Sequence, residues 1–133
     1  MADLFILALL GHLTGDYLLQ SKKMALRKSE VGLNGILWCT SHMIFYTAAV
    51  CLFLWTISLP VVALVFIPHW IIDRWSLAHS WLNLIHGRTF ESAYQSKEKY
   101  REFDIAFTCL VYAVADNTMH LITLWFVIRF VML

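Results

Sequence analysis

The sequence predicts an all-α fold: a polytopic membrane protein built as a bundle of four transmembrane helices, with residues 1–133 forming a single integral membrane domain. Hydrophobic residues make up 60% of the chain and charged residues only 14%, whereas soluble domains average about 45–50% and about 25%. A chain of 133 residues has too little interior to hide so much apolar surface from water. The apolar residues also gather in four segments, each close to the length of about 20 residues that crosses a bilayer.

The four predicted spans cover residues 4–20, 35–57, 60–81 and 105–131. The second and third spans are joined by the short turn at Ser58–Pro60, so we expect them to form a tight antiparallel hairpin. The polar segments 21–34 and 82–104 separate the other spans, and each holds four of the ten basic residues. Because basic loops stay in the cytoplasm, both segments are predicted to be cytoplasmic and both termini to face outward.

Ionisable side chains inside the predicted spans are the most informative feature of the sequence. They are His12, Asp16, His42, His69, Asp73, Asp116 and His120. An aspartate at the centre of a span costs about 2.5–3.5 kcal/mol on the insertion scale, so such residues need partners and mark functional sites. Six of the seven form His/Asp pairs four residues apart, and residues with this spacing share one helix face.

These imidazoles and carboxylates are a suitable ligand set for a divalent metal, so we expect one or two bound ions. Zinc is the favoured candidate, and manganese or iron also fit, because ligand type alone does not select among them. Counting turns from the cytoplasmic ends of the spans spreads the seven side chains over a layer of about 15 Å. That layer is thicker than one tight site. The alternative is that the pairs only form hydrogen bonds between helices.

Four other positions in the spans have a possible structural or binding role. Gly11 and Gly15 form a GxxxG pattern, which lets a neighbouring helix approach closely. Pro68 precedes His69 and is expected to kink its helix there. Arg74 is predicted to point away from Asp73 and to reach the cytoplasmic headgroups, or to bind an anionic lipid headgroup near the metal layer.

The motif pattern over essentially the whole chain resembles a known family. It consists of His12-x3-Asp16-x3-Gln20, a lone His42, His69-x3-Asp73 and Asp116-x3-His120. It is similar to the small bacterial and phage integral membrane proteins grouped as domain of unknown function 3307, and more loosely to membrane-bound metal-dependent hydrolases. That family often has Gln after the last Asp, where this chain has Asn117. The resemblance implies a bacterial inner-membrane protein and brings no settled activity.

The first functional hypothesis is a metal-dependent hydrolase that acts on a lipid or lipid-linked substrate from the cytoplasmic leaflet. His12, Asp16, His69 and Asp73 would be the primary ligands, and His42, Asp116 and His120 would complete a second site. Asp116 or His42 would alternatively be the catalytic base. Gln20 and Asn117 would hold the ligands in place.

Two alternatives belong to other classes of function. Intramembrane histidines and aspartates also serve metal-ion or proton transport, for which four spans would have to form a homo-oligomer. An accessory membrane protein, with the polar layer acting only between helices, is the third hypothesis. The outer halves of the spans are almost wholly apolar, which favours a site closed on the outside. Membrane lipids are the expected partners, and a net charge of +1 argues against nucleic acid.

Overall fold

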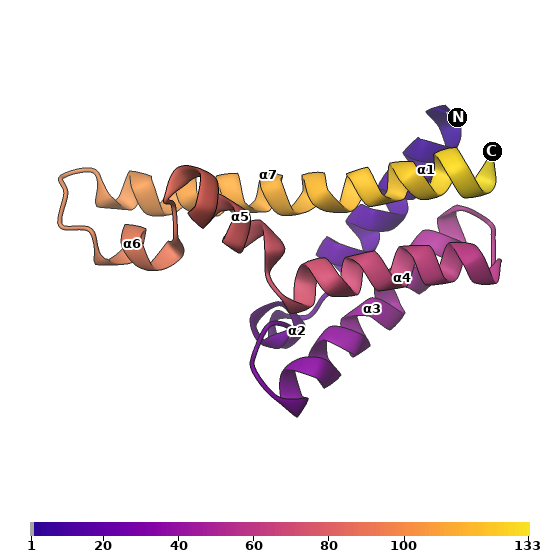
Figure 1. The fold of residues 1–133 in the computed structure, drawn as a ribbon, viewed down its shortest axis with the longest axis horizontal. Helices are drawn as coiled ribbons and strands as arrows, with labels where there is room; N and C mark the ends of the chain where they lie inside the picture. Colours follow the sequence, from indigo (N-terminus) through magenta and orange to yellow (C-terminus); the bar gives the residue numbers. More distant parts are fainter. Residues whose placement is uncertain (1) are drawn as a thin grey trace.

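The computed structural model describes residues 2–133 and shows an all-α protein (Figure 1). Seven α-helices and two short π-helical segments make up this part of the chain. In order they are α1 (Ala2–Leu13), η1 (Thr14–Leu18), α2 (Lys22–Arg27), α3 (Leu33–Phe53), α4 (Leu59–Arg74), α5 (Leu77–His86), α6 (Phe90–Gln95), α7 (Arg101–Val127) and η2 (Ile128–Met132). The two termini lie close together at one end, and α6 lies beside the beginning of α7 at the other (Figure 1).

Within residues 2–133, two helices are long and apolar enough to cross a membrane. They are α3 and the continuous helix formed by α7 and η2, Arg101–Met132. A third span is present if α4 and α5 count as one bent span. The structure therefore supports a membrane protein with two to three candidate spans, rather than the four predicted. The first predicted span, 4–20, does not qualify, because its α-helix ends at Leu13 and continues only as the short η1.

The predicted span 60–81 is not one straight helix. α4 ends at Arg74 and α5 begins at Leu77, with an angle of 54° between them. Ser76 sits in the break in the left-handed conformation, with φ of 47°, which L-residues adopt only at a cost. The break lies at Trp75 and Ser76, whereas Pro68, where a kink was expected, lies within the continuous α4.

The end of the bundle near the termini has an apolar core. Its buried members come from α1, α3, α4, α7 and η2, and they are Ala8, Met43, Tyr46, Val50, Leu54, Val61, Val65, Leu124, Val127 and Ile128. The outward faces are apolar too. Of the 18-residue apolar stretch within the helix formed by α7 and η2, only 11% is buried inside the structure. Helices that stay this apolar on the outside are suited to a lipid surrounding.

Two glycines allow α1 and η1 to lie directly against α3. A Cβ on Gly11 would stand 2.7 Å from the Cα of Val50, and a Cβ on Gly15 would stand 2.6 Å from the Tyr46 ring. Neither helix could approach this closely with larger residues. The structure therefore confirms the close approach expected from the GxxxG pattern, and it places His12 and Asp16 against α3.

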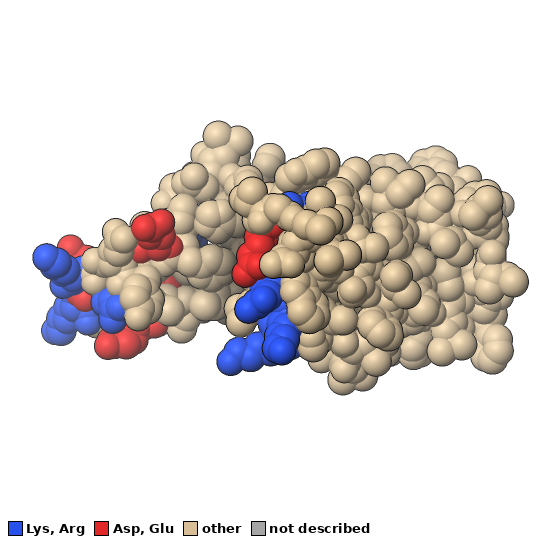
Figure 2. Space-filling model, turned by 90° about the horizontal axis from the view of Figure 1, so that it is seen from below, with Lys and Arg blue, Asp and Glu red and all other residues tan. Residues whose placement is uncertain are grey.

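Most charged side chains on the face shown in Figure 2 lie in the half of the molecule away from the termini. They lie over α6 and the beginning of α7 at one end and over α2 near the middle, and none is visible on this face at the end with the termini. The short helices here begin at side-chain caps, with Ser21 accepting from the Met24 amide and Thr89 from the Ser92 amide. Arg88 fastens this region to α7 through Asp104 at 2.9 Å.

Candidate metal centre

Five helical elements bring the seven predicted ionisable residues together inside the bundle. α1 and η1 carry His12 and Asp16, α3 carries His42, α4 carries His69 and Asp73, and α7 carries Asp116 and His120. The four histidines and Asp73 are almost fully buried, with at most 2% of each residue exposed. The Asp16 and Asp116 side chains are 12% and 14% exposed. The cluster therefore sits where charge is expensive unless it is paired.

A π-helical turn sets the position of Asp16. In η1 the amide of Leu19 donates to the carbonyl of Thr14, five residues earlier, at 3.0 Å. Such a turn is wider than an α-helical turn, and π-helical turns are frequent at functional sites. Asp16 thus contacts side chains of α3 and α4 as well as His12, its neighbour four residues earlier.

Four side-chain atoms from three parts of the chain lie near one another. His42 Nε2 lies 3.2 Å from Asp16 Oδ1 and 3.4 Å from Asp73 Oδ2. His69 Nε2 lies 3.6 Å from the same Asp16 oxygen and 3.4 Å from the same Asp73 oxygen. Metal–ligand bonds of about 2.0–2.2 Å place the ligand atoms of a tetrahedral site about 3.3–3.6 Å apart. The four separations between a histidine nitrogen and a carboxylate oxygen are close to four of the six edges of such a site.

The same four atoms are left without hydrogen bonds. Asp16 Oδ1, His42 Nε2, His69 Nε2 and Asp73 Oδ2 are buried and have no hydrogen-bond partner of acceptable geometry within residues 2–133. Buried polar atoms are normally paired, and each unpaired one costs about 1–3 kcal/mol. Four of them facing one another need a common partner, and a cation is the partner that lone pairs on nitrogen and oxygen would share.

Two further groups of side chains adjoin this set. Asp73, Asp116 and His120 each offer one atom within 4.8 Å of the others, and so do His12, Asp16 and His69. In the first group His120 Nε2 lies 3.5 Å from Asp73 Oδ1 and 3.6 Å from Asp116 Oδ2. The buried histidines and aspartates could thus hold a metal ion, and Asp73 belongs to two of the possible positions.

Lys28 enters the cluster from the segment after α2. Its Nζ donates to Asp73 Oδ1 at 2.7 Å, and its side chain is only 13% exposed. Burial alone would lower the pKa of Lys28, but the negative charge of Asp73 and this hydrogen bond outweigh burial and raise the pKa above its ordinary value. Lys28 is therefore a permanent positive charge at the edge of the cluster.

His12 differs from the other histidines because both of its ring nitrogens have partners. Asn117 Nδ2 donates to the Ala113 carbonyl at 2.7 Å, so Asn117 Oδ1 faces His12. His12 Nε2 must then donate to that oxygen, at 2.8 Å, which leaves Nδ1 to accept from the Tyr46 hydroxyl at 3.1 Å. This chain of hydrogen bonds fixes one neutral tautomer of His12.

Comparison with known proteins identifies the chain at the level of its family. The family model described as Protein of unknown function (DUF3307) matches residues 4–133, nearly the whole sequence. The chain belongs to the DUF3307 family. The resemblance inferred from the His/Asp motifs is thereby confirmed. No curated protein and no solved structure matches the chain.

A polar cavity gives access to the cluster of this DUF3307 protein from the charged end. It has a volume of about 200 Å³. Its lining comprises Asp16, Tyr17, Gln20, Ala25, Lys28, Tyr112, Ala113, Asp116 and Asn117. The Nε2 of Gln20 is buried with no hydrogen-bond partner among the described residues. Gln20 and Asn117 therefore both adjoin the site, as the motif suggested, but Asn117 supports His12 while Gln20 faces the cavity.

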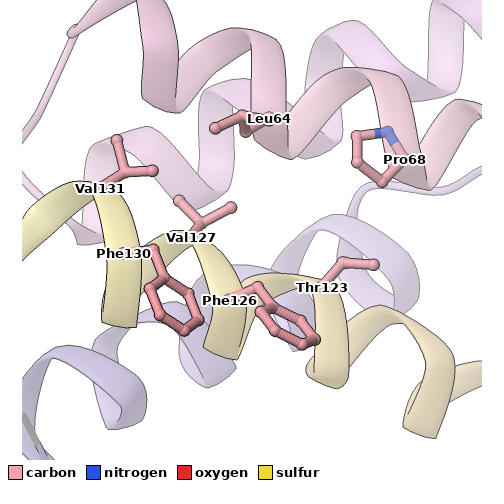
Figure 3. A pocket seen from close by; sticks show the side chains of 7 residues that line it. All are labelled: Leu64, Pro68, Thr123, Phe126, Val127, Phe130 and Val131. Carbon is pink, nitrogen blue, oxygen red and sulfur yellow. The ribbon is translucent and has the colours of Figure 1, made fainter.

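An apolar groove elsewhere in the DUF3307 chain has a different character. It lies between α4 and the C-terminal part of α7 with η2, and Leu64, Pro68, Phe126 and Phe130 are among its lining residues (Figure 3). None of its lining residues is charged. This groove offers no group that could bind a metal or transfer a proton, so we place the candidate site at the buried cluster.

The histidine rings of the cluster lie close together, whereas the depth of the whole cluster along a membrane stays a prediction. The predicted layer of about 15 Å assumed straight helices counted from their ends. In the structure the rings of His69 and His120 stack with centroids 3.6 Å apart, and those of His42 and His69 are 5.6 Å apart. The π turn of η1 and the early end of α4 at Arg74 change the register that the count assumed.

Two residues of the site were not predicted. Tyr46 holds His12, and its ring centroid lies 3.7 Å from that of His69. Its spacing of four from His42 was a signal, because it puts both on one face of α3. Lys28 gave no such signal, since its contact with Asp73 joins residues 45 apart in the sequence. Arg74, expected at lipid headgroups, donates to the carbonyl of Ser29 at 3.2 Å, and its headgroup role stays a prediction.

Proposed function

We propose that this chain is a membrane-embedded metal-binding protein whose primary ligands are Asp16, His42, His69 and Asp73. The observation that carries the proposal is a set of four buried, unpaired atoms in which each histidine nitrogen lies 3.2–3.6 Å from both carboxylate oxygens. Two imidazole nitrogens and two carboxylate oxygens suit zinc, manganese or iron, and zinc is the first ion to test. This ligand set replaces His12 by His42, because both nitrogens of His12 already have partners.

The polar cavity supports a hydrolase as the function of this centre. It brings solvent and substrate to Asp16, which is also in the ligand set, and to Asp116, which we propose as the general base. Lys28 in the same lining offers a positive charge to an anionic ester or phosphate. A metal in such a site activates water for hydrolysis. We propose a lipid or lipid-linked substrate that enters from the cytoplasmic leaflet.

Transport across the membrane is less well supported than hydrolysis. The buried core between the cluster and the termini consists of apolar side chains and Tyr46. A conducting path needs polar groups or water along its length, and this core offers none in residues 2–133 beyond the Tyr46 hydroxyl and the buried Thr47 hydroxyl. A site reached through the polar cavity beside Asp16 and Asp116 suits an enzyme of the inner leaflet better.

Metal analysis of the detergent-purified protein tests the proposal. The native protein is expected to hold zinc, manganese or iron, and His42→Ala and His69→Ala are each expected to lose it. His86→Ala is the matched control, because His86 is exposed on α5 away from the cluster, and it should keep the metal. If native protein loaded with excess zinc, manganese or iron binds none of them after desalting, the proposal is wrong.

The hydrolase assignment needs its own measurement. Asp116→Asn should keep the bound metal but reduce hydrolysis of phospholipid esters in mixed micelles by about 100-fold or more, the usual contribution of a general base. An Asp104→Asn control alters a carboxylate of the same helix outside the cluster and should retain activity. A metal-loaded native protein that hydrolyses neither phospholipids nor isoprenoid-linked phosphates would leave metal binding intact and remove the hydrolase assignment.

A further inference from the structure

The second group of candidate ligands shares an oxygen with Lys28. A second metal bound by Asp116 and His120 would need Asp73 Oδ1, which lies 3.5 Å from His120 Nε2. Lys28 Nζ already contacts that oxygen at 2.7 Å. A divalent ion about 2.0–2.2 Å from the same oxygen would stand next to the ammonium group, and two cations that close repel each other strongly at a buried site.

The net charge of the cluster also favours one divalent ion over two. Asp16, Asp73 and Asp116 supply three negative charges, and Lys28 supplies one positive charge. One divalent cation added to Lys28 therefore neutralises the cluster. A second divalent cation would leave it with two excess positive charges in a buried site, where uncompensated charge is costly.

We propose that Lys28 occupies the place of a second metal, so that the centre binds one divalent ion and not two. The inference rests on the proposed metal-binding function and adds the number of ions and the reason for it. Lys28 balances the charge of Asp73 and leaves Asp116 and His120 without a metal. Asp116 thus stays free to accept a proton in the cavity that it lines.

The stoichiometry of zinc binding tests this inference. Purified protein is stripped of metal, saturated with excess Zn²⁺, desalted and analysed for zinc and protein. Native protein is expected to hold one equivalent of zinc. Lys28→Met keeps the side-chain length but removes the charge, and it is expected to hold two equivalents. Lys28→Arg is the matched control, because it keeps the positive charge and should hold one equivalent.

A double variant locates the second ion. Lys28→Met combined with Asp116→Asn removes a ligand of the second position and should return to one equivalent. Two equivalents in native protein, or one equivalent in folded Lys28→Met, would overturn the inference while leaving the metal-binding function intact. Two equivalents in the double variant would place the second ion elsewhere and would also overturn it. No zinc in native protein would instead refute the metal-binding function itself. If Lys28→Met does not fold, the native stoichiometry still tests the number of ions, because two equivalents in native protein would overturn the inference.

Discussion

The four buried histidines all lie within predicted spans, but they differ in what their ring nitrogens contact. His42, His69 and His120 have both ring nitrogens buried and without hydrogen-bond partners in the described chain. His12, in contrast, is held between Tyr46 and Asn117. A histidine with a free lone pair can bind a metal, whereas one held on both sides supports its neighbours. The three His/Asp pairs have the same spacing, yet His12 supports its neighbours, whereas His69 and His120 have ring nitrogens available to bind a metal.

The Tyr46 hydroxyl gives a test of the supporting role of His12. Tyr46→Phe leaves the buried Nδ1 of His12 without its donor, so the free energy of unfolding in mixed micelles should fall by about 1–3 kcal/mol. Zinc stoichiometry should not change, because Tyr46 is not in the ligand set. The exposed Tyr94→Phe is the control and should change stability by less than about 0.5 kcal/mol. An unchanged stability of Tyr46→Phe would show that the hydrogen bond to His12 contributes nothing.

Short irregular elements, rather than the long helices, determine how the ligands meet. The π turn of η1 lets Asp16 contact both α3 and α4. The break at Trp75 and Ser76 ends α4 at Arg74, one residue after Asp73, and α5 turns by 54° from α4 and packs against α7. Hydropathy alone predicted one continuous span from 60 to 81, because Leu77–His86 remains apolar enough to extend it.

The contact between α1 and α3 gives a test at the level of elements. Gly11→Ala puts a methyl group 2.7 Å from the Val50 backbone, which cannot move aside as a side-chain end can. The expected cost is about 1–3 kcal/mol of unfolding free energy, together with weaker zinc binding, because α1 continues into the turn that carries Asp16. Both are measured on detergent-purified protein, by unfolding in mixed micelles and by zinc titration.

The control for this substitution adds volume on an outward face. Ala106→Val enlarges an exposed residue of α7 and should leave both zinc affinity and stability nearly unchanged. Normal zinc affinity in a stably folded Gly11→Ala protein would mean that the position of Asp16 does not depend on the close approach of α1 to α3.

The whole molecule is divided between an apolar end with both termini and a charged end with the cavity. With two to three candidate spans supported by length and composition, we propose that α1 and η1 supply a further one, which would put both basic segments on the cytoplasmic side. The unburied apolar faces, above all that of α7, are available to lipid or to a second copy of the chain.

Cysteine labelling tests this orientation. In a background with Cys39, Cys51 and Cys109 replaced by Ala, Ser58→Cys marks the turn between α3 and α4, and Lys97→Cys marks the segment before α7. A membrane-impermeant thiol reagent applied to intact cells should label Ser58→Cys and should label Lys97→Cys only after permeabilisation. Labelling of Lys97→Cys in intact cells would contradict the predicted orientation, and equal labelling of both positions would require an even number of spans, or none, between them.

The sequence by itself determined the class of protein, the all-α fold, the family and the residues that form the buried cluster. These follow from composition and from spacing along a helix, which are local properties: an aspartate four residues from a histidine lies on its face whatever the helix packs against.

Only the tertiary structure decided which atoms face one another. The pairing of His42 with Asp16 and Asp73, the partners of His12 and the contact of Lys28 with Asp73 all join residues distant in the sequence. They depend on where helices end, turn and approach, and these are set by the π turn, the break after Asp73 and the two glycines of the first helix. A single sequence shows the residues that cause this turn, this break and this close approach. It does not show their effect on the ligands, because that effect arises only when the helices pack together.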